Sequence, residues 1–203
     1  MLLYHYMRRL PEGERRKLTV EIPWEMCYHT VRLIKGRLTM KILVFSDSHS
    51  SISFMRDCLE AVKPDALIHL GDHYDDGETI REEYPHIPAY QVPGNCDKYR
   101  MPGFVPEILI QKVFGVKLYM THGHRHNVKL GPWALLRDAR ASGCDIALYG
   151  HTHIADCRRE EDGLWVLNPG AASFSGSAGL IEIQDSKITA CRILDRWTLE
   201  EMK

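Results

Sequence analysis

The sequence predicts a layered α/β fold with either one large mixed β-sheet or two packed sheets. Across residues 41–149, short apolar and β-branched runs alternate with segments of helical period. Beyond residue 154 the pattern changes to short strands joined by tight turns at Asp162-Gly163 and Asp185-Ser186. Strand–helix alternation followed by β-hairpins is typical of helices packed on mixed sheets. The length of 203 residues suits one domain with an appendage.

The first half of this domain should alternate strands and helices. Residues 41–45 read as a buried strand, because they are apolar or β-branched apart from Lys41. A helix is expected near 51–63, where the apolar residues share one face and Pro64 ends the segment. The next expected elements are a strand over 66–70, a polar surface helix over 76–84 and a strand over 89–92.

The second half should begin with a hairpin around Gly115, formed by strands near 105–111 and 116–120. A helix over 132–142 follows, with Pro132 at a first-turn position. A strand over 146–149 completes the alternating part. The remaining expected strands lie near 155–160, 164–167, 179–184 and 187–194.

The two ends of the chain differ from the predicted domain, which covers residues 40–194. Residues 1–39 carry eight Lys or Arg against four Glu and show no sustained amphipathic pattern. We interpret them as a basic N-terminal extension that is either disordered or not natively translated; a partner-binding arm is the third alternative. Met40 stands directly before the first core strand, as an initiator would. Residues 195–203 are expected to form a C-terminal tail.

Composition gives no sign of a nucleic-acid-binding, disulfide-rich or membrane-spanning protein. A net charge of −1 gives no reason to expect a surface for long nucleic acids. The six cysteines form no Cys-x-x-Cys pair, and without a signal peptide they are expected to be reduced thiols in a cytoplasmic protein. No apolar run reaches the ~18 to 20 residues that span a membrane.

Five short motifs occupy the same kind of place, the loop that follows a predicted strand. In open α/β sheets, ligands bind beyond the carboxyl ends of the strands, so all five loops could face one cleft. Independent turns would have no reason to supply so many metal-capable side chains. The motifs are Asp47-Ser48-His49, Gly71-Asp72, Gly94-Asn95-Cys96-Asp97, His122-Gly123-His124 and Gly150-His151-Thr152-His153.

The order of these motifs resembles the signature of the calcineurin-like metallophosphoesterases. The compact spacing, with Gly94-Asn95-Cys96-Asp97 in the middle, looks most like the small bacterial and archaeal phosphodiesterase branch. The resemblance covers about residues 40–194 and leaves out the N-terminal extension. It implies an α/β/β/α sandwich of mixed β-sheets flanked by helices.

The resemblance also implies two divalent metal ions. Asp47, His49 and His153 would hold the first ion. Asn95, His122 and His151 would hold the second, and Asp72 would bridge both. Manganese is the expected metal, and this mixture of imidazole, carboxylate and amide ligands also suits nickel, zinc or iron.

Three further residues are candidates for catalysis. Cys96 stands where larger phosphatases of the family commonly have a His that is thought to protonate the leaving group. A thiol with an ordinary pKa of about 8.5 is a poorer acid, so His124 or water is an alternative proton donor. Cys96 could equally be a packing residue. His124 is expected to contact the substrate phosphate, and Asp97 to orient a neighbouring group.

The resemblance therefore implies a metal-dependent phosphoesterase, most plausibly a phosphodiesterase, in which a metal-bridging hydroxide attacks the phosphorus. The alternative is a non-catalytic protein-binding scaffold of the same fold. All seven ligand positions are filled, which favours an enzyme. The expected partner is a small phosphate ester, including a small nucleotide; no membrane partner is expected, and an oligomer stays open.

Overall fold

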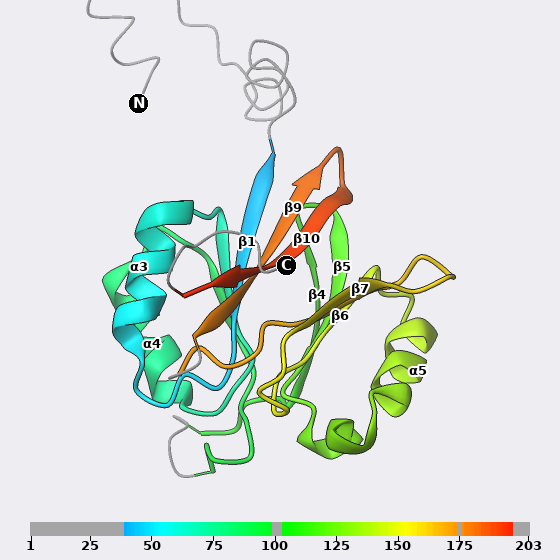
Figure 1. Cartoon of the computed structure of the whole chain (residues 1–203), viewed down its shortest axis with the longest axis horizontal. Coiled ribbons are helices and arrows are strands. Elements are labelled where there is room, and N and C mark those ends of the chain that lie inside the picture. The colour runs from blue at the N-terminus through cyan, green and yellow to red at the C-terminus, as the bar shows by residue number, and fades with distance from the viewer. Residues whose placement is uncertain (1–38, 99–102, 174–175, 197–203) are drawn as a thin grey trace, which may run out of the picture. The chain divides into compact units, whose positions relative to one another are not determined.

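The computed structural model describes residues 39–98, 103–173 and 176–196, and Figure 1 shows their arrangement. The strands in these ranges form two five-stranded mixed sheets. The predicted N-terminal extension (1–39) and C-terminal tail (195–203) fall almost wholly outside the described residues, so both stay predictions. None of the helices in the described part is long and apolar enough to cross a membrane.

The first sheet is built around β1 (Met40–Phe45), which lies at its centre. Because both faces of this strand are covered, its sequence is almost continuously apolar. The strand pairs in parallel with β2 and antiparallel with β9. The other members are β2 (Ala66–His69), β3 (Ala89–Gln91), β9 (Ser177–Gln184) and β10 (Lys187–Asp195), in the order β10-β9-β1-β2-β3.

The second sheet has the order β4-β5-β6-β8-β7. Its three central strands, β5, β6 and β8, run parallel, and the two edge strands are antiparallel to their neighbours. The strands are β4 (Ile108–Val113), β5 (Val116–Thr121), β6 (Ile146–Leu148), β7 (Asp156–Arg159) and β8 (Trp165–Asn168).

Alternating side chains of the strands divide the core into three clusters. Ile42 and Val44 of β1 meet Leu118 and Met120 of β5 between the sheets. The opposite face of the first sheet packs against α3 (Ile52–Val62) and α4 (Tyr74–Glu83). The opposite face of the second sheet packs against α5 (Trp133–Ala141), so the helices lie outside and the sheets inside (Figure 1). The predicted α/β/β/α sandwich is confirmed.

Some local predictions need correction. The second helix was expected to be a surface helix over 76–84, but α4 begins at Tyr74, and Tyr74, Asp76 and Ile80 are buried. The first hairpin strand begins at Ile108, three residues later than expected. Two short 3-10 helices follow β5, η2 (His124–His126) and η3 (Val128–Leu130), and the sequence did not predict either.

The parallel strands of both sheets direct their carboxyl ends to the same edge of the molecule. The amide of Gly150 after β6 donates to the carbonyl of His122 after β5 at 3.0 Å. The amide of Asp47 after β1 donates to the carbonyl of Gly71 after β2 at 2.9 Å. The amide of His151 donates to Asp47 across the two sheets, and the amide of Cys96 after β3 donates to Asp72 after β2. The five motif loops are therefore neighbours in space, as the topology of an α/β sheet allows.

Cys58 on α3 gives a test of the core between helix and sheet. It packs with Leu43 and Phe45, and burial raises the pKa of its thiol to about 12. Above about pH 8.5 the unfolded chain gives up this proton while the folded chain keeps it. Because the folded pKa is the higher one, the stabilisation is complete below the unfolded pKa and falls as pH rises toward the folded pKa, by about 1.4 kcal/mol per pH unit.

We expect the free energy of unfolding, measured in urea between about pH 9 and pH 11, to fall less steeply in Cys58→Ala than in the unaltered chain. The variant has a small cavity, which lowers its stability by a similar amount at every pH. Equal pH slopes for the two chains would contradict burial of an un-ionised thiol at this position.

Candidate functional site

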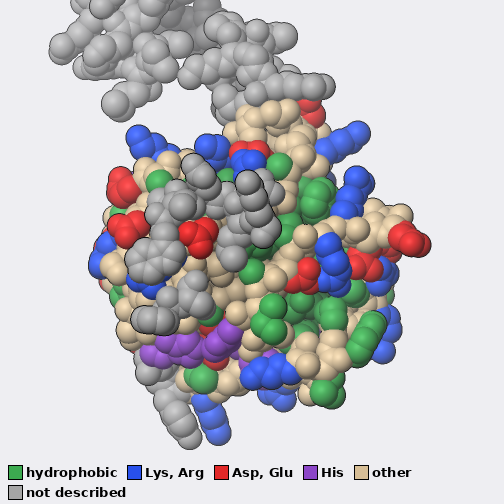
Figure 2. Space-filling view, viewed as in Figure 1, with side chains coloured by type: hydrophobic (Ala, Val, Ile, Leu, Met, Phe, Trp, Pro, Cys, Tyr) green, Lys and Arg blue, Asp and Glu red, His purple; other side chains and the backbone are tan. Residues whose placement is uncertain are grey.

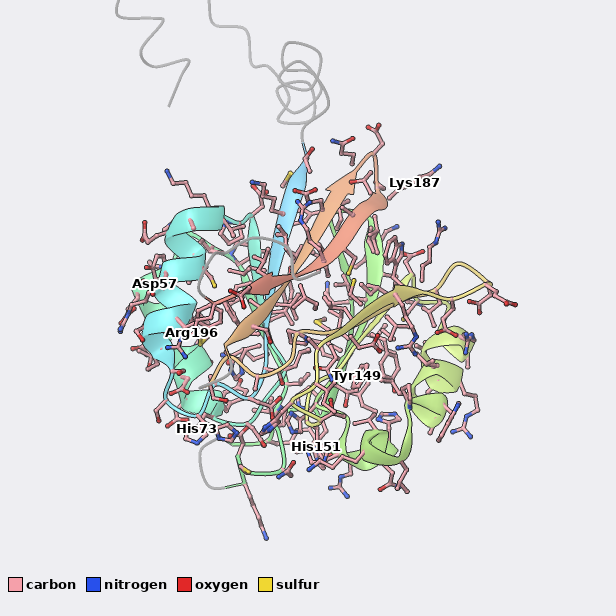
Figure 3. All side chains as sticks on the ribbon, in the orientation of Figure 1. Asp57, His73, Tyr149, His151, Lys187 and Arg196 are labelled. Carbon is pink, nitrogen blue, oxygen red and sulfur yellow. The ribbon has the colours of Figure 1, made fainter. Side chains whose placement is uncertain are left out.

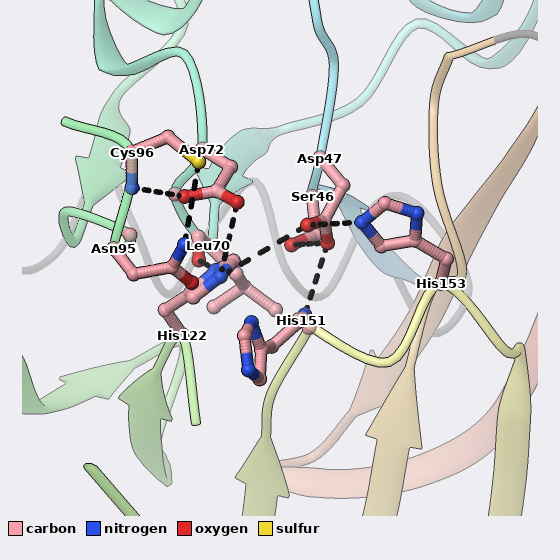
Figure 4. A network of polar contacts seen from close by, with 12 residues as sticks. Ser46, Asp47, Leu70, Asp72, Asn95, Cys96, His122, His151 and His153 are labelled. Carbon is pink, nitrogen blue, oxygen red and sulfur yellow. Dashed lines mark hydrogen bonds and ion pairs between the residues drawn. The ribbon is translucent and has the colours of Figure 1, made fainter. Parts of the chain in front are cut away.

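Backbone and side-chain hydrogen bonds join the motif loops into one site, shown in Figure 4. The amide of His151 donates to Oδ2 of Asp47 at 3.0 Å, which connects the loops after β6 and β1. Nδ1 of His122 lies 2.8 Å from the carbonyl oxygen of Leu70, which connects the loops after β5 and β2. Histidines of the molecule gather in a row along one edge of the face seen in Figure 2.

Asp47 is fully buried and uses its two carboxylate oxygens differently. Oδ2 accepts hydrogen bonds from the Ser46 hydroxyl at 2.6 Å and from the His151 amide. Oδ1 has no hydrogen-bond partner among the described residues, although Nε2 of His153 lies 3.0 Å away and Nε2 of His122 lies 3.9 Å away. A buried carboxylate oxygen in this state requires a compensating charge.

The backbone explains how Asp47 and His49 come together. Both residues lie just past the end of β1, which ends at Phe45. Both have left-handed backbone angles, with φ of 54° at Asp47 and 42° at His49. The two side chains therefore converge through a tight left-handed turn, a conformation that is uncommon for residues other than glycine.

His122 is held in a single orientation in the centre of the site, where it is fully buried. A carbonyl oxygen can only accept, so the contact with Leu70 places a proton on Nδ1 and leaves Nε2 to face the carboxylates. Nε2 lies 3.5 Å from Oδ2 of Asp72 and has no hydrogen-bond partner among the described residues. Burial alone would lower the pKa of His122, but the carboxylates of Asp72 and Asp47 outweigh it and raise that pKa.

Asp72 balances the same opposing effects. Burial would raise the pKa of its carboxyl, but His122 and the amide of Cys96, which donates to Oδ1 at 2.8 Å, hold that pKa well below its usual range. The loops fit closely here, because a Cβ added at Gly94 would lie 2.1 Å from Oδ1 of Asp72. A Cβ added at Gly71, where φ is +94°, would clash with the backbone amide of Gly94. Glycine is therefore required at both positions.

Asp97 organises the backbone around Asp72. Its carboxylate is fully buried and accepts four amide hydrogen bonds, at 2.7–2.9 Å. Three of the donors form the turn after β2, and the fourth is Gly94 in its own loop. The donors are the amides of Asp72, His73, Tyr74 and Gly94. This geometry agrees with a residue that orients its neighbours; its part in catalysis stays a prediction.

Six of the seven predicted metal ligands lie in two adjacent groups. In each group, one ligand atom per residue lies within 4.8 Å of the others. The unpartnered atoms Asp47 Oδ1 and His122 Nε2 belong to different groups and lie 3.9 Å apart. The negative potential that favours a proton on His122 also favours a cation there, so the donor set fits divalent ions. The groups are Asp47, His49, His153 and Asp72, His122, His151.

Asn95, the seventh predicted ligand, is exposed on the loop after β3, where its Nδ2 lies 3.3 Å from Sγ of Cys96. Cys96 is also exposed as a residue, and partial desolvation of its thiol together with nearby Asp72 raises the pKa of that thiol. The roles predicted for both residues are not tested by this geometry.

His124 lies beside the second group, with its ring 5.5 Å from that of His122 and 6.2 Å from that of His151. Burial, followed by the neighbouring His122, lowers the pKa of His124, so its imidazole is neutral at neutral pH. Its Nδ1 is buried and has no hydrogen-bond partner within the described ranges. The ring therefore lies at the edge of the second group; its predicted contact with the substrate phosphate stays a prediction.

Sequence reasoning missed several residues that support these loops. The side-chain amide of Asn168 donates to Gly150 O at 3.2 Å and to Thr152 Oγ1 at 2.9 Å, which fixes the loop of His151 and His153. Asp76 was placed on a surface helix, but it is buried and accepts hydrogen bonds from the loop after β1. The helical pattern carried no signal for it, because a polar residue in a polar segment looks exposed.

Comparisons with known proteins identify the family of this chain. The calcineurin-like phosphoesterase superfamily domain matches residues 40–186. A probable metallophosphoesterase of Mycoplasma pneumoniae is 31% identical over 134 residues, covering 64% of this chain and 78% of that protein. A crystal structure of a predicted phosphoesterase from Streptococcus pneumoniae has 26% identity and a TM-score of 0.64, and covers 82% of this chain and 95% of that one.

A structure with lower identity shares the fold alone. Vps29 of Entamoeba histolytica, solved in complex with zinc, is 22% identical with a TM-score of 0.56, over 77% of this chain and 99% of that chain. The family match extends over most of the chain and includes all five loops described above. This chain, a two-sheet sandwich with histidines and carboxylates along one edge, therefore belongs to the calcineurin-like phosphoesterase superfamily.

Proposed function

We propose that this protein is a phosphodiesterase that depends on two divalent metal ions. The observation that supports it best is the pair of adjacent ligand groups, each with a buried atom that lacks a hydrogen-bond partner within the described residues. Asp47, His49 and His153 hold the first ion. Asn95, His122 and His151 hold the second, and Asp72 lies between them. Manganese is the expected metal, with nickel, zinc and iron as alternatives.

The charge of the site suits a phosphate ester. Asp47 and Asp72 supply two negative charges, and imidazole and amide ligands supply none. Two divalent ions would stabilise the phosphate oxygens and lower the pKa of a shared water toward ~7. Such a site keeps a positive excess, which attracts the anionic substrate and opposes binding of neutral esters.

The side chains around the site leave water as the nucleophile. The Ser46 hydroxyl donates to Asp47, and the Ser48 hydroxyl donates to Asp76 at 2.7 Å, so both are buried and engaged. The raised pKa of Cys96 keeps its sulfur as a thiol at neutral pH, which is a weak nucleophile. A covalent intermediate on any of these three residues is therefore disfavoured.

The weak proton donors near the site favour esters with a good leaving group, and the exposure of its rim favours a diester. A neutral His124 is not a strong acid, and the raised pKa of Cys96 makes its thiol a poor one. Esters whose leaving group departs without full protonation therefore react best. His49 and His153 are exposed, and so are Asn95 and Cys96, which leaves room for a second ester substituent.

A metal-ligand substitution tests the site itself. Asp47→Asn removes the negative charge of the carboxylate whose Oδ1 lacks a hydrogen-bond partner among the described residues, and it keeps the shape of the side chain. We expect loss of about one metal equivalent and a fall in kcat/KM larger than the roughly 10- to 100-fold seen when a hydrogen-bond partner of a ligand is removed. Metal analysis of the purified chain and diester hydrolysis measure the two effects, and circular dichroism checks that the fold is kept.

Asp57→Asn is the matched control, because Asp57 is an exposed carboxylate on the outer side of α3 (Figure 3). It should keep both metal content and turnover. Full activity in Asp47→Asn would contradict the proposed metal site.

A substrate screen tests the reaction class. Bis-p-nitrophenyl phosphate should be hydrolysed with a kcat/KM at least about tenfold above that of p-nitrophenyl phosphate, a difference of about 1.4 kcal/mol in transition-state stabilisation. The assay is repeated with Mn²⁺, Ni²⁺, Zn²⁺ and Mg²⁺, and Mn²⁺ is expected to support the highest rate. Preference for the monoester would refute the diesterase assignment. A metal-loaded chain that hydrolyses neither ester would favour the protein-binding scaffold instead.

The role of Cys96 can be separated from that of His124. Loss of a general acid costs about 10²–10⁴ in rate, and most when the leaving group is poor. We expect Cys96→Ala to change kcat by less than about threefold for both nitrophenyl and alkyl diesters, because its thiol is a poor donor. His124→Gln should lower kcat/KM for both by removing a phosphate contact. A large loss in Cys96→Ala that is confined to alkyl diesters would instead identify Cys96 as the proton donor.

A further inference from the structure

The loop after β1 is held in an unfavourable backbone conformation. Asp47, His49 and Ser50 all have positive φ, with φ of 69° at Ser50. L-residues avoid this region, so three of them within four positions persist only where surrounding contacts hold them. Two of the three are next to Ser48, whose side chain is fully buried under the loop.

The contacts that hold this loop come from the first turn of α4. Oδ2 of Asp76 accepts a hydrogen bond from the Ser48 hydroxyl at 2.7 Å and a second one from the Ser50 amide at 2.8 Å. One carboxylate oxygen therefore binds the loop on both sides of His49. Asp76 is 4% exposed and lies in the first turn of α4.

The direction of each hydrogen bond in this network can be assigned. The Gly71 amide donates to Nδ1 of His69 at 3.3 Å, so the proton of the neutral ring is on Nε2. Burial lowers the pKa of His69, in agreement with a neutral ring. Nε2 then donates to Oγ of Ser48 at 3.1 Å, and the Ser48 hydroxyl donates to Asp76. The Ser48 hydroxyl also lies 3.4 Å from the carbonyl oxygen of Asp72, but Asp76 Oδ2 at 2.7 Å is its nearer and charged acceptor, which favours this arrangement.

The same helix turn also supports the ring of His49. His73, which precedes α4, contacts the His49 ring edge-on with ring centroids 4.9 Å apart. Nδ1 of His73 lies 3.8 Å from Oδ2 of Asp76. Figure 3 shows His73 at the same edge of the molecule as His151. The start of α4 therefore fixes both the backbone and the side chain of the loop that carries the first ligand group.

An alternative reading makes Asp76 itself a metal ligand, because His73, Asp75 and Asp76 also lie close enough to surround an ion. Two observations oppose it. Oδ2 of Asp76 already accepts two hydrogen bonds at 2.7 and 2.8 Å. Asp75 is exposed, whereas Asp76 is buried and directed toward the loop after β1.

We propose that Ser48 and Asp76 are positioning residues for the first metal ion: together they hold the loop after β1 in the left-handed conformation that directs Asp47 and His49 toward His153. The inference rests on the proposed function. Neither residue touches the substrate or the ion. The two short hydrogen bonds of Asp76 end on the loop of the first group, and the second group is reached only by the longer contact of Ser48 Oγ with the Asp72 carbonyl at 3.4 Å. Loss of the network therefore weakens binding of the first ion most and leaves the second, whose other ligands come from the loops after β3, β5 and β6, largely unchanged.

The test is metal binding by the full-length chain after removal of its metal, measured by calorimetric titration with Mn²⁺. Ser48→Ala and Asp76→Ala should each weaken one of the two equivalents by about 10- to 100-fold, the usual effect of losing a hydrogen-bond partner of a ligand. The double variant should bind no more weakly than Asp76→Ala alone, because the Ser48 hydroxyl acts through its hydrogen bond to Asp76, whereas Asp76 also accepts from the Ser50 amide. Asp76→Asn can still accept both hydrogen bonds through its amide oxygen, so it should stay within about threefold of the unaltered chain.

Control variants separate positioning from packing and from a third metal site. Asp75→Asn removes a neighbouring carboxylate on the same helix turn and should leave both equivalents unchanged. Lower thermal stability in Ser48→Ala and Asp76→Ala with unchanged Mn²⁺ affinity would mean that the network serves packing alone, and would overturn the proposal. Loss of a further Mn²⁺ equivalent in both Asp75→Asn and Asp76→Ala would overturn it in favour of a cation site.

Asp47→Asn, titrated in parallel, separates a failure of the positioning role from a failure of the proposed metal site. If it loses an equivalent while Ser48→Ala and Asp76→Ala bind normally, the positioning role is wrong and the proposed function stands. If Asp47→Asn itself binds both equivalents normally, the proposed metal site is wrong, and the positioning role is wrong with it.

Discussion

Two negative charges buried around one imidazole are the constraint on which the rest of this structure depends. Asp47 and Asp72 are almost completely inaccessible, and His122 Nε2 faces both. A buried carboxylate is costly unless hydrogen bonds or a cation compensate it. Here amides and a hydroxyl satisfy one oxygen of Asp47 and one of Asp72, and the remaining oxygens face the space that the histidines surround. The backbone amides thus hold the two carboxylates so that their remaining oxygens create a negative potential where a cation would bind.

The two-sheet architecture makes this preparation possible. Parallel strands from both sheets end at the same edge, so loops more than a hundred residues apart can donate to one carboxylate, as the amide of His151 does to Asp47. Supporting side chains then lock the loops to each other: Asp97 for the turn after β2, Asn168 for the loop after β6 and Asp76 for the loop after β1. The ligand groups therefore depend on tertiary contacts of the sandwich more than on any single loop.

The sequence predicted the regular parts of the fold well, because buried strands and amphipathic helices leave periodic patterns. It also predicted which loops would meet, because glycine beside a histidine or carboxylate recurred after successive strands. It did not predict the burial of Asp76, since a single polar residue in a polar helix gives no periodic signal. Nor did it predict the left-handed turn at Asp47 and His49 or the 3-10 helices after β5. These depend on contacts from distant parts of the chain, which local propensity does not contain.

The orientation of His122 has a consequence for how this protein tolerates sequence change. Its Nδ1 proton is directed by the main-chain carbonyl of Leu70. In many metal sites the equivalent partner is a carboxylate side chain, which a single base change can remove. A main-chain carbonyl is present whatever residue occupies position 70. The tautomer of His122 therefore depends on how the two sheets pack and not on the identity of a side chain. Mutational drift can alter the surroundings of the site extensively before it alters which nitrogen of His122 is free.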